Sequence, residues 1–238
     1  MLRQSFTANA PRADCRERLS EAFVERTYET LERCVAVQKG ADGDPAESIE
    51  FSRVEVQDDR AVVDLELRGG DPGGAEGSVE LVDEGSGWRI DDASVEFLRS
   101  LLEASTASQQ RAGELPPGAR GCLARVTRDI ADPAFKEFAY AVIGETEQGK
   151  RWFFELFAAC DVSDGRSLLR VTFEREVAKA LMARSVGDRA VECILARLRD
   201  GIPDRELAAL LAAEDQEPLA KVAAAASRAC GSQSGSAS

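Results

Sequence analysis

Two stretches in the second half of the chain read as copies of each other, "CLARVTRDIADP" at residues 122–133 and "CILARLRDGIPD" at residues 193–204. Each is followed by an apolar helical stretch, an acidic break, a second apolar stretch and a closing cysteine, Cys160 or Cys230. A helical hairpin with one apolar face cannot bury that face alone, whereas two related hairpins can pack face to face. The repeat therefore predicts an all-α domain of two related, disulfide-linked helical hairpins over residues 118–230.

Apolar side chains recur at helical spacing in both copies. The first copy carries the stripes Phe135, Phe138, Ala139, Val142 and Phe153, Leu156, Phe157, Cys160. Helix-start signals stand at equivalent places, Asp132-Pro133 and Pro203-Asp204. The stretch "RSLLRVTFEREVAKALMARS", residues 166–185, predicts a longer helix that joins the copies, and residues 231–238, "GSQSGSAS", predict a disordered tail.

Cysteine placement suggests local disulfide bonds, although sequence alone cannot select among the many possible pairings. Cys122 with Cys160 and Cys193 with Cys230 bracket the two copies, which leaves Cys15 with Cys34. A straight helix would hold Cys15 and Cys34 roughly 28 Å apart, whereas a disulfide needs Cα atoms within about 7 Å. The chain must therefore turn back between them, near Ser20 or Arg26-Thr27. The alternative is six buried, reduced thiols in a cytosolic protein.

The first half has a different pattern. Residues 11–38 have helical spacing, and from Ile49 the period changes to that of strands. "SIEFSRVEV" (48–56) alternates but switches phase at Arg53, which predicts a β-bulge. "RAVVDLELRG" (60–69) predicts a half-buried strand, and "SVELVDEGSGWRI" (78–90) predicts a strand, a turn and a further strand. We therefore expect helices, an antiparallel meander of about four strands, and a helix after Asp92.

A connection between domains is predicted at residues 104–117. This segment is low in apolar residues and contains Pro116-Pro117. The chain then divides into an α+β domain at residues 1–103 and a helical repeat domain at residues 118–230.

The N-terminal half resembles the nuclear-transport-factor-2-like superfamily in three stretches, "FTANAPRADCRERLSEAFVERTYETLERC", "VEVQDDRAVVDLEL" and "VELVDEGSGWRID". This superfamily has a cone-shaped fold, shared with SnoaL-type proteins and ketosteroid isomerase. More narrowly, the pattern is similar to extracytoplasmic actinobacterial members with a cysteine-paired helical segment before the sheet. The resemblance covers residues 1–103 and implies an α+β cone fold in a secreted protein or lipoprotein of the cell envelope.

The beginning of the chain departs from that family. "MLRQSFTANAPRADC" is similar to only the end of the family's first helix, which in such proteins follows an export or lipoprotein signal. We therefore expect Met1 to be an internal or misassigned start, and a longer native chain to carry a signal. The expected location is extracytoplasmic.

Composition argues against several functions. The chain of 238 residues has 30 basic and 43 acidic residues, a net charge of −13, which would repel a phosphate backbone, so nucleic-acid binding is not expected. No run approaches the roughly 20 apolar residues that a membrane-spanning helix needs. Histidine is absent, which removes the commonest general base and metal ligand, and no Cys-x-x-Cys pair is present. We expect no metal and no cofactor.

One stretch nearly matches a phosphate-binding loop. "GETEQGKR", residues 144–151, has the Gly-x-x-x-x-Gly-Lys spacing, but Arg151 stands where the metal-binding hydroxyl belongs. Glu145 and Glu147 would also place negative charge beside a phosphate. We therefore interpret the match as chance.

The resembled fold encloses a pocket between its sheet and helices, and family enzymes place an acid or base there. The inward candidates in this chain are Tyr28, Phe51 and Trp88, with ordinary core packing as the alternative interpretation. Asp91 and Asp92 follow a predicted strand, so we expect turn and helix-cap roles for them and assign no catalytic residue.

These observations favour a non-enzymatic, extracytoplasmic binding or protein-interaction module whose ligand is unknown. The alternative is a small-molecule carrier or an enzyme that uses the cone pocket for a hydrophobic ligand. A third possibility is a cytosolic scaffold with reduced cysteines. The expected partner is a protein or a small hydrophobic molecule.

Overall fold

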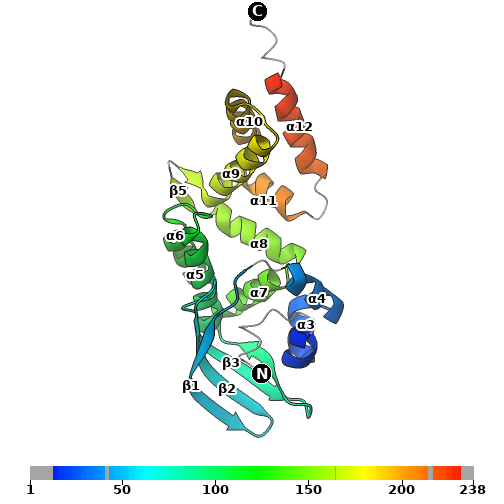
Figure 1. The fold of residues 1–238 in the computed structure, drawn as a ribbon, viewed down its shortest axis with the longest axis vertical. Helices are drawn as coiled ribbons and strands as arrows, with labels where there is room; N and C mark the ends of the chain where they lie inside the picture. Colours follow the sequence, from blue (N-terminus) through cyan, green and yellow to red (C-terminus); the bar gives the residue numbers. More distant parts are fainter. Residues whose placement is uncertain (1–12, 41–42, 164, 214–216, 232–238) are drawn as a thin grey trace, which may run out of the picture. The chain divides into compact units, whose positions relative to one another are not determined.

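A computed structural model of the chain describes residues 13–40, 43–163, 165–213 and 217–231 (Figure 1). The chain divides into two compact units. The first unit comprises residues 1–115 and 127–149, and the second comprises residues 116–126 and 150–238.

The first unit contains a four-stranded antiparallel sheet. Its strands are β1 (Ser48–Gln57), β2 (Arg60–Arg68), β3 (Glu76–Asp83) and β4 (Trp88–Ala93), and they neighbour one another in chain order. This confirms the predicted meander. The register of β1 on β2 shifts between Phe51 and Arg53, which confirms the predicted bulge. The buried row of β2 is the one its alternation predicted, Ala61, Val63, Leu65 and Leu67.

Helical turns precede the sheet because two breaks fold the predicted helix back on itself. The elements are a π-helical turn η1 (Asp14–Arg18), α3 (Glu21–Tyr28) and α4 (Leu31–Gly40). Ser20 makes the first break and accepts a hydrogen bond from the Phe23 backbone N–H at 2.9 Å, as an N-cap does. The second break lies at Glu29, with φ of 66°, slightly later than Arg26-Thr27. The fold-back brings the bonded cysteines Cys15 and Cys34 to a Cα separation of 6.1 Å.

The segment expected to link the domains is largely helical. Helix α5 (Val95–Arg111) begins at the N-cap Ser94 and continues through the first part of 104–117, with Ala104 and Thr106 buried. The prediction of a linker there differs from the structure because alanine, serine and glutamine provide few apolar contacts yet tolerate a helix. Gly77 allows α5 to approach β3, since a Cβ there would lie 2.7 Å from the Phe97 backbone.

Helix α7 (Asp132–Ile143) belongs to the first unit, although the sequence placed it in the helical repeat domain. It packs against α3 and α5, while α5 lies on β3 and α3 on β4. The glycines of the near phosphate-loop match serve this packing. A Cβ at Gly144 would collide with the Thr27 carbonyl oxygen, and one at Gly149 would collide with that of Ala141.

The second unit is mostly helical. It holds most of α6 (Ala119–Arg128) and α8 (Glu147–Ala158), then β5 (Asp161–Ser163), β6 (Arg166–Ser167), α9 (Leu168–Ala183), α10 (Asp188–Gly201), α11 (Asp204–Ala212) and α12 (Glu217–Gly231). An all-α domain was predicted here, but β5 pairs with β6, so the unit also contains a short two-stranded sheet. Two disulfides join Cys122 to Cys160 and Cys193 to Cys230, at Cα separations of 5.6 and 5.9 Å.

The helices of the two copies are divided differently between the units. The helices of the second copy, α10 to α12, pack on α9 and on one another, whereas α7 of the first copy packs within the first unit. The face-to-face packing of the two hairpins stays a prediction. The predicted tail at 231–238 lies outside the described residues except for Gly231, which ends α12.

A buried arginine organises the second unit. Arg170 on α9 is 4% exposed, and its guanidinium donates to the Asp204 carboxylate at 2.8 Å and to the carbonyl oxygens of Leu198 and Ile202. The Ser167 hydroxyl, which caps α9, also donates to Asp204. One side chain thus satisfies the end of α10 and anchors the start of α11.

The first unit contains an equivalent arginine. Arg99 on α5 donates to the carbonyl oxygens of Thr127 and Ile130 and to the Asp132 carboxylate, at 2.7 Å for Ile130 and 3.1 Å for Asp132. The same chain spacing separates Arg99 from Arg170 and Cys122 from Cys193. The repeat therefore begins one helix earlier than the cysteines indicated, with α5 to α8 matching α9 to α12.

Candidate functional site

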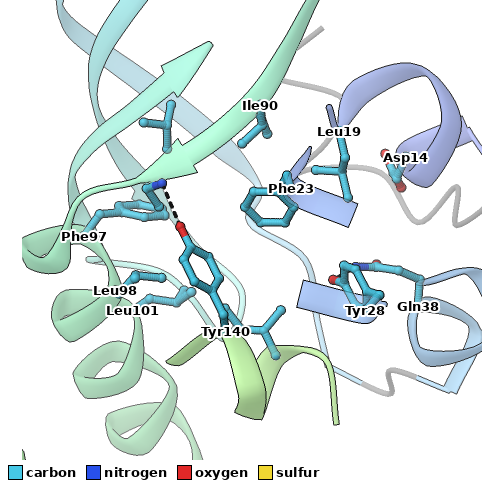
Figure 2. A pocket seen from close by; sticks show the side chains of 13 residues that line it. Asp14, Leu19, Phe23, Tyr28, Gln38, Ile90, Phe97, Leu98, Leu101 and Tyr140 are labelled. Atoms are coloured by element: carbon cyan, nitrogen blue, oxygen red, sulfur yellow. Dashed lines mark hydrogen bonds between the residues drawn. The ribbon is translucent and has the colours of Figure 1, made fainter. Parts of the chain in front are cut away.

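The first unit contains a partly open, apolar cavity of about 180 Å³ beside its sheet (Figure 2). The side chains around it come from η1, α3, α4, the strands β3 and β4, α5 and α7. They are Asp14, Leu19, Phe23, Tyr28, Gln38, Val79, Ile90, Ala93, Phe97, Leu98, Leu101, Tyr140 and Ile143. Most of this lining is aliphatic or aromatic, so the cavity favours an apolar occupant.

Tyr28 supplies one polar atom at the cavity. Its side chain, at the end of α3, lies beside Gln38 (Figure 2) and is 1% exposed. Its hydroxyl accepts a hydrogen bond from Gln38 at 3.1 Å. Burial raises the pKa of Tyr28 above its usual value, which keeps the phenol protonated. The neighbouring Asp14 carboxylate is ion-paired with Arg18.

Tyr140 supplies a second polar atom from α7. Its hydroxyl accepts a hydrogen bond from the Ala93 backbone N–H at 3.0 Å, the dashed line in Figure 2, and donates to the Asp92 carboxylate. Lys136, one turn earlier on α7, forms an ion pair with the same carboxylate at 2.6 Å. Tyr140 thereby ties α7 to the end of β4.

The pKa values of Tyr140 and Asp92 are both shifted away from neutral pH. Burial, helped by the hydrogen bond to Asp92, raises the pKa of Tyr140. Burial alone would raise the pKa of Asp92, but hydrogen bonds from Lys136 and Tyr140 outweigh it and lower that pKa. Near neutral pH the tyrosine keeps its proton and the aspartate stays ionised, so neither group is poised to exchange a proton.

Aromatic contacts hold Tyr140 in place. Phe23 meets its ring edge-to-face, with centroids 5.5 Å apart. The Arg26 guanidinium lies 4.9 Å from the Tyr140 centroid and donates a hydrogen bond to the Asp91 carbonyl oxygen at 2.5 Å. Tyr140 is thus clamped between α3 and β4, as expected of a structural side chain.

Only one of the three predicted pocket residues lines this cavity, namely Tyr28. Phe51 lies on β1 and is 41% exposed, away from the lining. Trp88 begins β4, two residues before the lining residue Ile90, and is half-buried. The alternation of apolar residues predicted the faces of Phe51 and Trp88, but it did not show which end of each strand the helices cover.

The predicted roles of Asp91 and Asp92 are also corrected. Both lie within β4, and the helix cap belongs to Ser94. Asp91 accepts a hydrogen bond from the Ser20 hydroxyl at 2.6 Å, and Asp92 binds Lys136 and Tyr140. Their carboxylates therefore fasten helices to the end of the sheet.

Most of the cavity's aromatic lining was not predicted from the sequence. Phe23 and Phe97 were assigned to helices without a site, and Tyr140 was assigned to the other domain. One signal was available: Tyr140 falls outside the apolar stripe of its helix, and a buried tyrosine hydroxyl needs a hydrogen-bond partner.

In the described part of the chain, no cluster of three or more His, Cys, Asp or Glu side chains is arranged to hold a metal ion. Among the helices that the structure describes, none has the length and apolar character to cross a membrane. Comparison of the chain with known protein families, with curated proteins and with solved structures finds no significant match to any of them.

Proposed function

We propose that the chain is a non-enzymatic, extracytoplasmic binding module and that its first unit has the cone fold of the nuclear-transport-factor-2-like superfamily. Helices that precede a four-stranded antiparallel meander, with a cavity beside the sheet, support the fold assignment. The three intramolecular disulfides support an oxidising compartment.

The observation that carries the binding role is the state of the cavity's polar groups. Tyr28 is bonded to Gln38, Asp14 to Arg18, and Tyr140 to Asp92 and Ala93. Acid–base catalysis needs a group whose pKa lies near the working pH and whose proton can reach a substrate. The polar groups at this cavity are bonded to one another or to the backbone, so they hold its walls in place. The apolar surface is then the part of the cavity that recognises a ligand.

The extracytoplasmic part of the proposal is tested by thiol counting on the protein from its native host. Cells are quenched in acid, the protein is denatured without reductant and alkylated, and its intact mass is measured. We expect no alkylated cysteine, and six after reduction. Peptide mapping should then recover the pairs Cys15–Cys34, Cys122–Cys160 and Cys193–Cys230. Six alkylated thiols without reductant would contradict an oxidising location.

The second candidate function is binding of a small apolar molecule, and the cavity itself favours it. Its volume of about 180 Å³ falls below the several hundred Å³ typical of drug-sized ligands. An apolar cavity of about 150 Å³ in another protein stays dry and binds benzene. A single aromatic ring is therefore the class of ligand that this cavity fits.

A thermal-shift titration with benzene and indole tests this candidate. We expect both to raise the unfolding midpoint in proportion to the logarithm of concentration once binding saturates. Ala93→Leu fills the cavity and should abolish the shift, whereas Ala180→Leu, at an exposed position on α9, should preserve it. Equal shifts for both variants would place the ligand outside the cavity.

A further inference from the structure

Strand β1 carries an uncovered apolar face. Its residues Phe51, Val54 and Val56 are 41, 60 and 62% exposed. They stand opposite Leu65, Val63 and Ala61 on β2, which are buried. Directly opposite residues in an antiparallel pair share a face, so the apolar face of the sheet continues from β2 onto β1 but loses its cover there.

Strand β1 is also an edge. Among the described residues it pairs with β2 alone, and the other side of the strand has no neighbour. An edge strand presents unpaired backbone N–H and C=O groups that can template pairing with another strand. Apolar exposure and a free edge thus coincide on residues 53–57.

The register identifies the residues whose backbone groups face the free edge. Gln57 and Arg60 are partners across a two-residue connection, and such a pair exchanges both backbone hydrogen bonds. Hydrogen-bonded and non-hydrogen-bonded pairs alternate along the strand, so Arg53 and Glu55 also direct their backbone groups to β2. Those of Val54 point to the free edge.

We infer that the β1 edge pairs antiparallel with the β1 edge of a second copy of this chain, with Val54 at the two-fold axis. In this register Arg53 stands opposite Glu55 of the second copy, and Glu55 stands opposite its Arg53. A two-fold interface uses the same surface of both copies. Arg53 and Glu55 of each copy therefore form two oppositely charged pairs across the interface.

Charge complementarity is the observation that selects a second copy as the partner. Arg53 and Glu55 lie on one face of β1 and are ion-paired with each other within the chain. Opposite charges directly across two strands stabilise their pairing, and like charges there destabilise it. The net charge of −13 opposes association in general, but at physiological salt the Debye length is about 8 Å, so the pairs nearest the axis dominate. In this register Glu50, beyond the bulge, faces Asp58 of the second copy, just past the end of β1, and these like-charged pairs oppose the two central Arg53–Glu55 pairs.

Charge reversal tests the interface on the full, disulfide-bonded chain by sedimentation at increasing concentration, up to roughly 100 µM. We expect a monomer–dimer equilibrium. Glu55→Arg places two like-charged pairs across the interface and should weaken dimerisation roughly tenfold or more. The double variant Arg53→Glu with Glu55→Arg restores both pairs and should recover the dimer. Glu192→Arg, exposed on α10, makes the same charge change and should have no effect.

Cysteine cross-linking tests the register independently. A hydrogen-bonded antiparallel pair has Cα atoms about 5.5 Å apart, within reach of a disulfide, so Val54→Cys should give a covalent dimer under mild oxidation. Val56→Cys is the matched control, because its exposure is nearly equal while its two copies would lie roughly 14 Å apart along the strands.

Three results would overturn the inference. The first is a chain that remains monomeric at the highest concentration, with unchanged circular dichroism showing that it is folded. The second is a dimer that both charge variants leave unchanged, which would place the contact elsewhere. The third is equal cross-linking at positions 54 and 56, which would exclude pairing centred on Val54.

Discussion

Replacing Arg170 with alanine is expected to lower the free energy of unfolding of the second unit by about 3–5 kcal/mol. The guanidinium is buried and holds the Asp204 carboxylate together with two backbone carbonyls at the end of α10. Alanine would leave the buried carbonyls of Leu198 and Ile202 without their donor. The Asp204 carboxylate, about a third exposed, would lose its cationic partner but keep its hydrogen bond from Ser167. Unpaired buried polar groups carry their full desolvation cost, so the loss exceeds that of an ordinary surface ion pair.

The measurement is guanidinium denaturation followed by tryptophan fluorescence. The chain has two tryptophans, and Trp88→Phe leaves Trp152 in α8 as a reporter of the second unit. Arg197→Ala, an exposed arginine of α10, is the control and should change the unfolding free energy by no more than about 0.5 kcal/mol. Arg170→Lys should recover only part of the loss, because an ammonium cannot reproduce the guanidinium fork. A loss below about 1 kcal/mol for Arg170→Ala would show that the cluster contributes little.

The sheet could be predicted from sequence because its signals are local. Alternation along β2 marked the buried row, and the change of phase at Arg53 marked the bulge. The fold-back between Cys15 and Cys34 followed from helix length and disulfide reach, with Ser20 as the break. Each inference used residues close in sequence and one geometric limit.

The division into units could not be predicted because it depends on contacts between distant segments. The first half of helix α5 was predicted as a helix after Asp92, but its contacts with the segment around Thr127 and Ile130, made by Arg99, were not, and its second half was interpreted as part of a linker. Helix α7 shares its pattern with α11, yet the two pack in different units. Identical local signals can therefore end in different surroundings, and only the long-range partners distinguish them.

The candidate cavity shows the same limit. Tyr28 was predicted as an inward residue for the pocket of the resembled fold, and the structure places it at the cavity. Phe51 was predicted from its face, but no described helix covers that part of β1, and it is exposed. Tyr140 comes from a helix that the sequence placed in another domain. Periodicity shows which side chains share one face of a strand, but it does not show whether a helix packs on that face.

Removal of the Cys193–Cys230 disulfide by the double change Cys193→Ala with Cys230→Ala is expected to release α12. The bond spans a sequence separation of 37, and loss of a cross-link of that length costs about 4 kcal/mol on the chain-entropy account. Helix α12 contacts α10 and α11, but its described residues bury few side chains there. Of its described side chains, only Ala226 and Cys230 are buried, and both are small.

Hydrogen exchange measures this release directly. In the intact protein the α12 amides should be protected, and in the double variant they should exchange at least about tenfold faster, while α9 and α10 keep most of their protection. Removal of Cys15–Cys34 by Cys15→Ala with Cys34→Ala is the control, since that bond lies in the first unit and its loss should leave α12 unchanged. Retained protection of α12 without Cys193–Cys230 would show that its contacts with α10 and α11 are sufficient. Collapse of protection throughout α9 to α12 would show instead that the disulfide supports the whole second copy, because the buried Arg170 cluster would then depend on α12 being held in place.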